Sequence, residues 1–187
     1  YQGSNAFSEP ETRNVKWLLD FYPQIGFFID TPCYSELFLY PWGDDENQFA
    51  DQNMNFQNSD HDGLRGIEGD GLYKDFIPQT SESWLKDIAN RMNDALHAVR
   101  GKSYTVQQEF QLYPAVGTST DYAFSRNFVD SSKHLIYPFV IEFGTEFSPW
   151  VPYEPEMVNI LKDVSAALTE FLACLTGSCI ISSTTQE

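Results

Sequence analysis

Apolar residues that recur every three or four positions form the clearest pattern in this chain, and they predict three helices. The first follows Ser8, which together with Glu11 makes a potential capping box at its start. The second is expected over Ser81–Arg100, and the third begins near Pro155. The apolar face of this last helix consists of Met157, Ile160, Leu161, Val164, Leu168, Phe171, Leu172 and Leu175.

Short apolar runs, which are typical of strands buried on both faces, lie between the predicted helices. Two of them cover residues 26–30 and 36–41, and a third lies within residues 134–142. Residues 104–112 alternate weakly and are expected to be extended, whereas residues 42–79 are rich in Gly, Asp and Asn and are expected to form a long loop. The order of these segments predicts an α/β fold with a mixed sheet covered by helices.

The composition fits one globular domain and narrows the range of partners. The chain has 187 residues, of which 42% are hydrophobic and 20% are charged. Its formal net charge is -16, and it has no basic cluster that could hold phosphates. We therefore expect neither nucleic acid nor an anionic membrane surface as a partner. The acidic run Asp44-Asp45-Glu46 is expected to be a solvated loop, with cation binding as the alternative.

The N-terminus and the cysteines do not indicate whether the protein is secreted. Tyr1-Gln2-Gly3-Ser4 has neither the basic segment nor the apolar run of a signal peptide, so we interpret it as a cut end. The three cysteines are too few for a disulfide scaffold. Cys174 and Cys179 could form a disulfide, which would leave Cys33 unpaired, but two thiols are an equally good prediction.

Four separate motifs resemble segments of the zinc metallocarboxypeptidases, the M14 or carboxypeptidase A-like family. They are residues 8–12 (SEPET), 34–43 (YSELFLYPWG), 112–122 (LYPAVGTSTDY) and 139–144 (FVIEFG), and they occur in the family's order over nearly the whole chain. The resemblance implies that residues 1–187 form a single, partial domain. This domain would correspond to the C-terminal half of a metallocarboxypeptidase-like domain, with the N-terminal half absent from this chain.

The resemblance also implies roles for individual residues. Glu142 is at the position of the general base, which in the family activates a zinc-bound water. Tyr113 is at the position of the tyrosine that closes over the C-terminal end of the substrate. Thr120 is at the position on the pocket floor that sets side-chain preference, where a small neutral residue implies apolar or aromatic substrates. The further substrate-binding positions implied by the resemblance are Asp121, which would favour a basic side chain, Leu39, Val140 and Tyr34.

Two departures from the family pattern concern the metal. Pro32 is at the position of a zinc-binding histidine, and proline has no side-chain donor atom. Cys33, one residue further, is a weak substitute, and His61, His97 and His134 lie at no matching position. Nothing in this chain resembles the His-x-x-Glu motif that supplies the family's other two ligands.

These departures favour a pseudoenzyme that has lost zinc and has a binding, storage or interaction role, with a peptide as the expected ligand. The alternative is one chain of an active, zinc-dependent, two-chain carboxypeptidase that removes C-terminal residues from peptides. In either case a half-domain must cover its open sheet edge. We therefore expect a second chain that supplies the N-terminal half, or self-association. The resemblance further implies a secreted protein.

Overall fold

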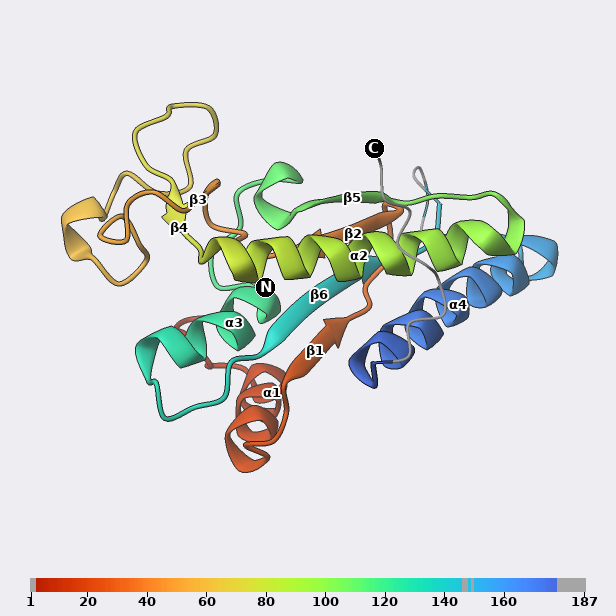
Figure 1. Ribbon diagram of the computed structural model, residues 1–187, viewed down its shortest axis with the longest axis horizontal. Coiled ribbons are helices and arrows are strands. Elements are labelled where there is room, and N and C mark those ends of the chain that lie inside the picture. The colour runs from red at the N-terminus through yellow and green to blue at the C-terminus, as the bar shows by residue number, and fades with distance from the viewer. Residues whose placement is uncertain (1–2, 146–147, 149, 178–187) are drawn as a thin grey trace.

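The computed structural model describes residues 3–145, 148 and 150–177. Figure 1 shows a sheet with helices packed against it. Its helices are α1 (Pro10–Phe21), α2 (Gln79–Arg100), α3 (Ser119–Val129) and α4 (Val158–Leu175), and its strands are β1 (Phe27–Asp30), β2 (Leu37–Tyr40), β3 (Asn47–Gln48), β4 (Asp75–Phe76), β5 (Thr105–Gln108) and β6 (Tyr137–Glu142).

The main sheet has four strands in the order β1-β6-β2-β5. β6 pairs parallel to β1 and antiparallel to β2, and β2 pairs parallel to β5. The sheet is therefore mixed, and the predicted α/β class is confirmed. β3 and β4 form a separate two-stranded sheet within the segment that was expected to be a long loop.

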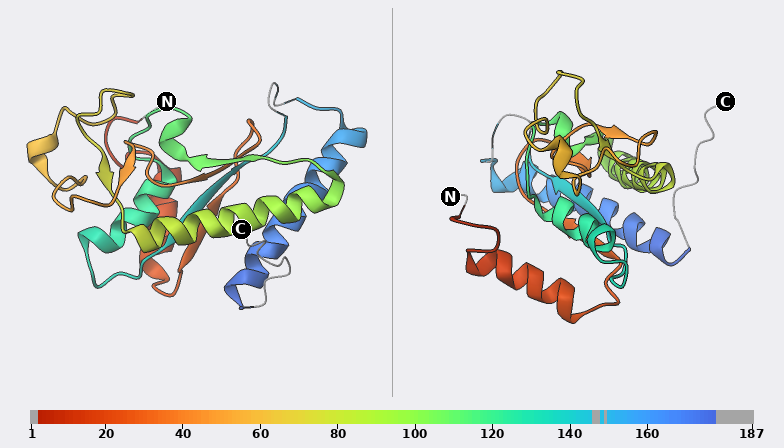
Figure 2. Two further views of the ribbon diagram at one scale, coloured as in Figure 1. Left: turned by 45° about the horizontal axis from the view of Figure 1, so that its top comes forward. Right: turned by 90° about the vertical axis from the view of Figure 1, so that its left-hand side faces the viewer.

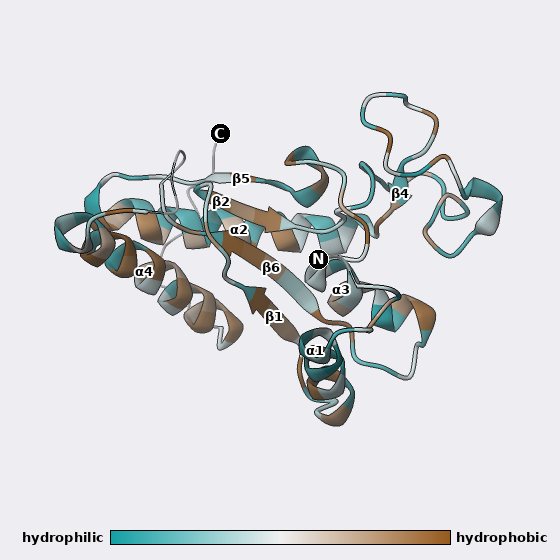
Figure 3. Ribbon diagram, turned by 180° about the vertical axis from the view of Figure 1, so that it is seen from behind, coloured by the Kyte–Doolittle hydropathy of each residue, from teal (hydrophilic) through white to brown (hydrophobic). Residues whose placement is uncertain are grey.

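Alternation along the central strands divides the apolar residues between the two faces of the sheet. Phe38 on β2 and Phe139 and Ile141 on β6 belong to the main core together with residues of α2 and α4. Leu39 and Val140, which point the other way, belong to a small cluster on the opposite face. Seen from that face, α2 and α4 lie behind the sheet (Figure 3).

The β1 side of the sheet differs from its centre. All four residues of β2 are buried, whereas the four residues of β1 are only partly buried. The prediction that residues 26–30 form a strand buried on both faces is therefore wrong in its burial, because β1 pairs only with β6 within the described residues. α1 lies away from α2 and α4, on the other side of the molecule (Figure 2).

Two local predictions need correction. α1 begins at Pro10 with Glu9 as its N-cap and no capping hydrogen bond from a side chain, so the capping box at Ser8 is wrong. The Ser8 hydroxyl instead donates to the Glu9 carboxylate, at 2.8 Å. α3 was not predicted as a helix; there the side chain of Thr118 caps the first turn by accepting a hydrogen bond from the Asp121 backbone N–H.

The acidic run after β2 is not a solvated loop as expected. Asp44 and Asp45 are buried, with 8% and 2% of their surface exposed. Asp45 remains hydrogen-bonded because it accepts from the backbone N–H groups of Glu46 and Gly66, at 2.7 and 2.9 Å. The second contact joins two distant parts of the segment between β2 and α2.

Two further observations bear on the expectations from sequence. Within the ranges that the structure covers, no helix is both long and apolar enough to cross a membrane. Cys179 lies outside the described residues, so its possible disulfide with Cys174 stays a prediction.

Candidate functional site

A pocket of about 130 Å³ opens on the face of the sheet opposite α2 and α4. It brings together five residues that the sequence singled out. These are Pro32, Leu39, Tyr113, Val140 and Glu142. The other lining residues are Asp30, Glu109, Leu112, Ala115, Thr118 and Ser119.

The pairing of β1 with β6 explains why distant residues meet at this pocket. The two strands run parallel, so they end at the same edge of the sheet, after Asp30 and at Glu142. The chain segments beyond them remain side by side, because the Phe143 backbone N–H donates to the Pro32 carbonyl, at 3.2 Å. Glu142 also shares a strand face with Val140, two residues earlier. Pro32 and Glu142 therefore line the same cavity.

The environments of Glu142 and Tyr113 differ. Burial raises the pKa of Glu142, and the Ser35 hydroxyl, which stabilises the ionised carboxylate, opposes that shift. A carboxylate whose proton affinity is raised in this way is better suited to accept a proton than an exposed one. Tyr113 is 61% exposed, and its side chain lies where the pocket meets solvent.

Four of the predicted substrate and metal residues do not line the pocket: Thr120, Asp121, Tyr34 and Cys33. Thr120 is fully buried, and its hydroxyl donates to the Glu109 carboxylate. Asp121 is also buried and accepts two contacts from the Gly43 backbone N–H, at 3.0 and 3.2 Å. Tyr34 and Cys33 are exposed. The roles assigned to these residues by resemblance stay predictions.

The sequence did not single out the two other acidic residues of the pocket, Asp30 and Glu109. Asp30 ends β1, and its position at the carboxyl end of a predicted strand was a usable signal. Glu109 lies in a single turn of 3-10 helix after β5, and no local motif marks it. Burial raises the pKa of Glu109, and the hydroxyls of Thr120 and Thr118 oppose the shift.

The described residues do not fit a zinc site by themselves. No three His, Cys, Asp or Glu side chains within this part of the chain are grouped so that they could hold a metal ion. Pro32, which lies in the pocket beside Glu142, offers no donor atom. A metal here would need ligands from outside the described residues.

Comparison with known proteins gives consistent matches. The family model of zinc carboxypeptidases, peptidase M14, matches residues 1–163. Carboxypeptidase B of Astacus astacus is 28% identical over 127 residues, which are 66% of this chain and 31% of that protein.

Two solved structures share the fold. Carboxypeptidase A of Helicoverpa armigera has a TM-score of 0.61 at 17% identity, covering 100% of this chain and 37% of its own. Bovine thrombin-activatable fibrinolysis inhibitor, solved in complex with tick carboxypeptidase inhibitor, has a TM-score of 0.57 at 17% identity, covering 93% of this chain and 49% of its own. The chain thus spans about a third to a half of the length of these relatives.

Proposed function

Because the chain belongs to the zinc carboxypeptidase family, peptidase M14, we propose that it is part of a carboxypeptidase-like protein that binds the C-terminal end of peptides but is catalytically impaired. Its role would be binding, storage or interaction rather than hydrolysis. The family membership further supports secretion as the proposed location.

The observation that carries this proposal is the position of Pro32. It lines the same pocket as Glu142, at the place where the family resemblance puts a histidine ligand. A catalytic zinc site needs three protein ligands and one open position. With a proline in place of one ligand, zinc affinity falls, and Glu142 has no metal-bound water to deprotonate. The pocket itself remains, so binding survives the loss of chemistry.

Zinc content and peptidase activity test this proposal together. The protein is purified with any chain that accompanies it, and bound zinc and hydrolysis of benzoyl-Gly-Phe and benzoyl-Gly-Arg are measured. We expect no stoichiometric zinc and no chelator-sensitive hydrolysis. Pro32→His should raise zinc occupancy, whereas the matched control Pro114→His, outside the pocket lining, should not. One zinc per wild-type chain, with hydrolysis abolished by Glu142→Gln, would overturn the proposal.

An active two-chain zinc carboxypeptidase is the second candidate. One observation favours it: Glu142 and Tyr113, the residues assigned to catalysis by resemblance, both line the cavity. A companion chain would then supply the His-x-x-Glu ligands, and Cys33 or a water would replace the missing histidine. Hydrolysis that is lost in Glu142→Gln and retained in a control such as Glu68→Gln, an exposed residue away from the pocket, would establish this candidate.

The proposed partner is a second chain that carries the N-terminal half of the domain, with self-association as the alternative. Among the residues that the structure describes, no strand pairs with the outer side of β1, and this supports the proposal because an exposed strand edge pairs readily with another strand. Exposed aromatic and aliphatic residues on α1 and just beyond it add apolar surface: Trp17, Leu18, Phe21 and Tyr22. Native mass spectrometry of the purified protein should show a complex. A monomer of 21.4 kDa would contradict the proposal.

A further inference from the structure

The charged side chains that line the pocket are all acidic. Asp30, Glu109 and Glu142 all line it, and its described lining contains no Lys, Arg or His. Asp30 accepts a hydrogen bond from the Ser119 hydroxyl, at 2.7 Å. Because like charges in a small volume repel, Asp30 and Glu142 add to the effect of burial in raising the pKa of Glu109. A cation in the pocket would relieve this repulsion.

The residues that resemblance assigns to side-chain preference cannot supply this charge to a ligand. Thr120 is fully buried and neutral, and its hydroxyl is already committed to Glu109. Asp121 is buried, does not line the pocket, and accepts a hydrogen bond from the Gly43 backbone N–H. Both residues act behind the wall of the pocket rather than on its surface.

Glu109 is held firmly in place by the start of α3. The hydroxyls of Thr120 and Thr118 both donate to its Oε2 atom, the latter at 3.5 Å, and the two hydroxyls lie 2.9 Å apart. Gly43 packs against the same carboxyl group: a Cβ atom there would lie 3.2 Å from Glu109 Cδ and 3.1 Å from the Ala115 carbonyl oxygen. The carboxylate therefore has a fixed position at the wall.

We infer that Glu109, rather than Thr120 or Asp121, sets the side-chain preference of this pocket, and that the preferred C-terminal residue is arginine or lysine. The inference rests on the proposed function, because it names the group that the same pocket accepts. The pocket volume of about 130 Å³ is below that of sites for drug-sized ligands, so it suits a single side chain. A guanidinium or ammonium group would meet a carboxylate whose position is already fixed, which gives a charge-assisted hydrogen bond.

Peptide binding measures this preference without relying on catalysis. Calorimetry is performed on the protein as purified, with benzoyl-Gly-Arg, benzoyl-Gly-Phe and benzoyl-Gly-citrulline, in which a neutral urea group replaces the guanidinium. We expect the arginine ligand to bind at least about tenfold more tightly than the citrulline ligand, the size that one charge-assisted hydrogen bond supplies. Glu109→Gln should reduce this ratio to about twofold, and the control Glu68→Gln should leave it unchanged.

The pH dependence provides a second readout. The arginine-to-citrulline ratio should fall as the pH is lowered and Glu109 takes up a proton. The acidic side chains that face Glu109 from the neighbouring elements are Asp30, Glu142 and Asp121. In Glu109→Gln this dependence should be largely lost. If Asp30 or Glu142 carried the preference instead, the variant would keep it.

The outcomes separate this inference from the proposed function. If benzoyl-Gly-Phe binds as tightly as benzoyl-Gly-Arg, or if Glu109→Gln leaves the ratio unchanged, the inference is wrong and the proposed peptide binding stands. If none of the ligands binds, the proposed function is wrong and the inference falls with it.

Discussion

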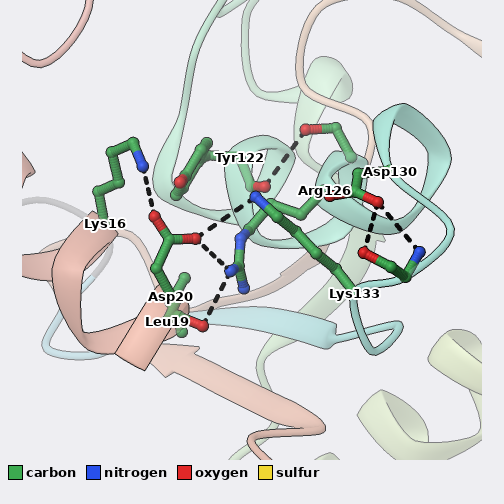
Figure 4. A network of polar contacts seen from close by, with 9 residues as sticks. Lys16, Leu19, Asp20, Tyr122, Arg126, Asp130 and Lys133 are labelled. Atoms are coloured by element: carbon green, nitrogen blue, oxygen red, sulfur yellow. Dashed lines mark hydrogen bonds and ion pairs between the residues drawn. The ribbon is translucent and has the colours of Figure 1, made fainter. Parts of the chain in front are cut away.

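Two aspartates in this molecule have pKa values shifted in opposite directions. Asp20, at the end of α1, contacts Lys16, Arg126 and Lys133 (Figure 4), and the hydrogen bond with Lys16 lowers its pKa to about 2. Asp75, on β4, is fully buried, and burial together with the negative charge of Asp44 raises its pKa to about 8. The comparison shows that burial and the charged groups that folding brings near a carboxyl group, and not the residue type, decide its protonation.

The largest expected effect comes from removing the titratable carboxyl group of Asp75. Its raised pKa means that the native state binds a proton more tightly than the unfolded chain, so the free energy of unfolding should fall as the pH rises from about 4 to about 8, by at most about 1.4 kcal/mol per unit. Asp75→Asn should flatten this slope. Urea unfolding across the window measures it, with Asp94→Asn on the exposed side of α2 as control. A steep slope in Asp75→Asn would show that another group is responsible.

The next largest effect is expected from Arg126, whose side chain links α3 to α1. Arg126 on α3 is buried and donates to the Leu19 carbonyl and to Asp20, at 2.8 and 2.6 Å. Arg126→Met keeps much of the side-chain volume but removes the side-chain donor to the Leu19 carbonyl and leaves Asp20 paired with Lys16 and Lys133. We therefore expect a loss of about 2 kcal/mol at pH 7. Denaturant unfolding measures this loss. The control Lys162→Met, at an exposed position on α4, should change stability by less than about 0.5 kcal/mol.

Some elements of the fold could be predicted from the sequence, and others could not. α2 and α4 follow from helical periodicity, because the spacing of their apolar residues indicates the face that they bury, and β1, β2 and β6 follow from short apolar runs. α3 was missed because its apolar residues are neighbours in the sequence rather than a helical stripe. The long segment before α2 was interpreted as solvated, because nothing local indicates that Asp44 and Asp45 become buried.

The sequence likewise predicted some residues of the candidate site and missed others. Glu142 was found because it lies in a recognisable motif, and Pro32 because it lies just before one. The parallel pairing of β1 with β6 places both residues at one pocket. Glu109 was missed because its position depends on tertiary contacts with Thr118 and Thr120, at the start of α3. Whether an acidic residue lies in the pocket therefore depends on tertiary contacts, which residue spacing in the sequence does not predict.

A smaller effect is expected from Asp20 itself, and it has the opposite pH dependence from that of Asp75. Because its pKa is lowered, Asp20 stabilises the native state above about pH 4, and this contribution is lost as the pH falls toward 2. Its side chain is 31% exposed, so solvent screening limits the contribution to about 1 kcal/mol. Asp20→Asn should therefore be less stable than wild type at pH 7, and the difference should be much smaller at pH 2.5. An equal deficit at both values would mean that the carboxylate charge is not what matters.

The smallest effect, and the sharpest test of the comparison, is expected from Lys16. It pairs with Asp20 one helical turn away, and the two side chains are 42% and 31% exposed, so Lys16→Met should cost about 0.3–0.5 kcal/mol at low salt. Mobile ions screen an exposed pair but not a buried one, so 1 M NaCl should remove this difference while leaving the pH slope that depends on Asp75 in place. Unfolding of both variants at low and high salt makes the measurement. If salt removed the Asp75 slope as well, that carboxyl group would be solvated, and the two aspartates would differ in their neighbours but not in their burial.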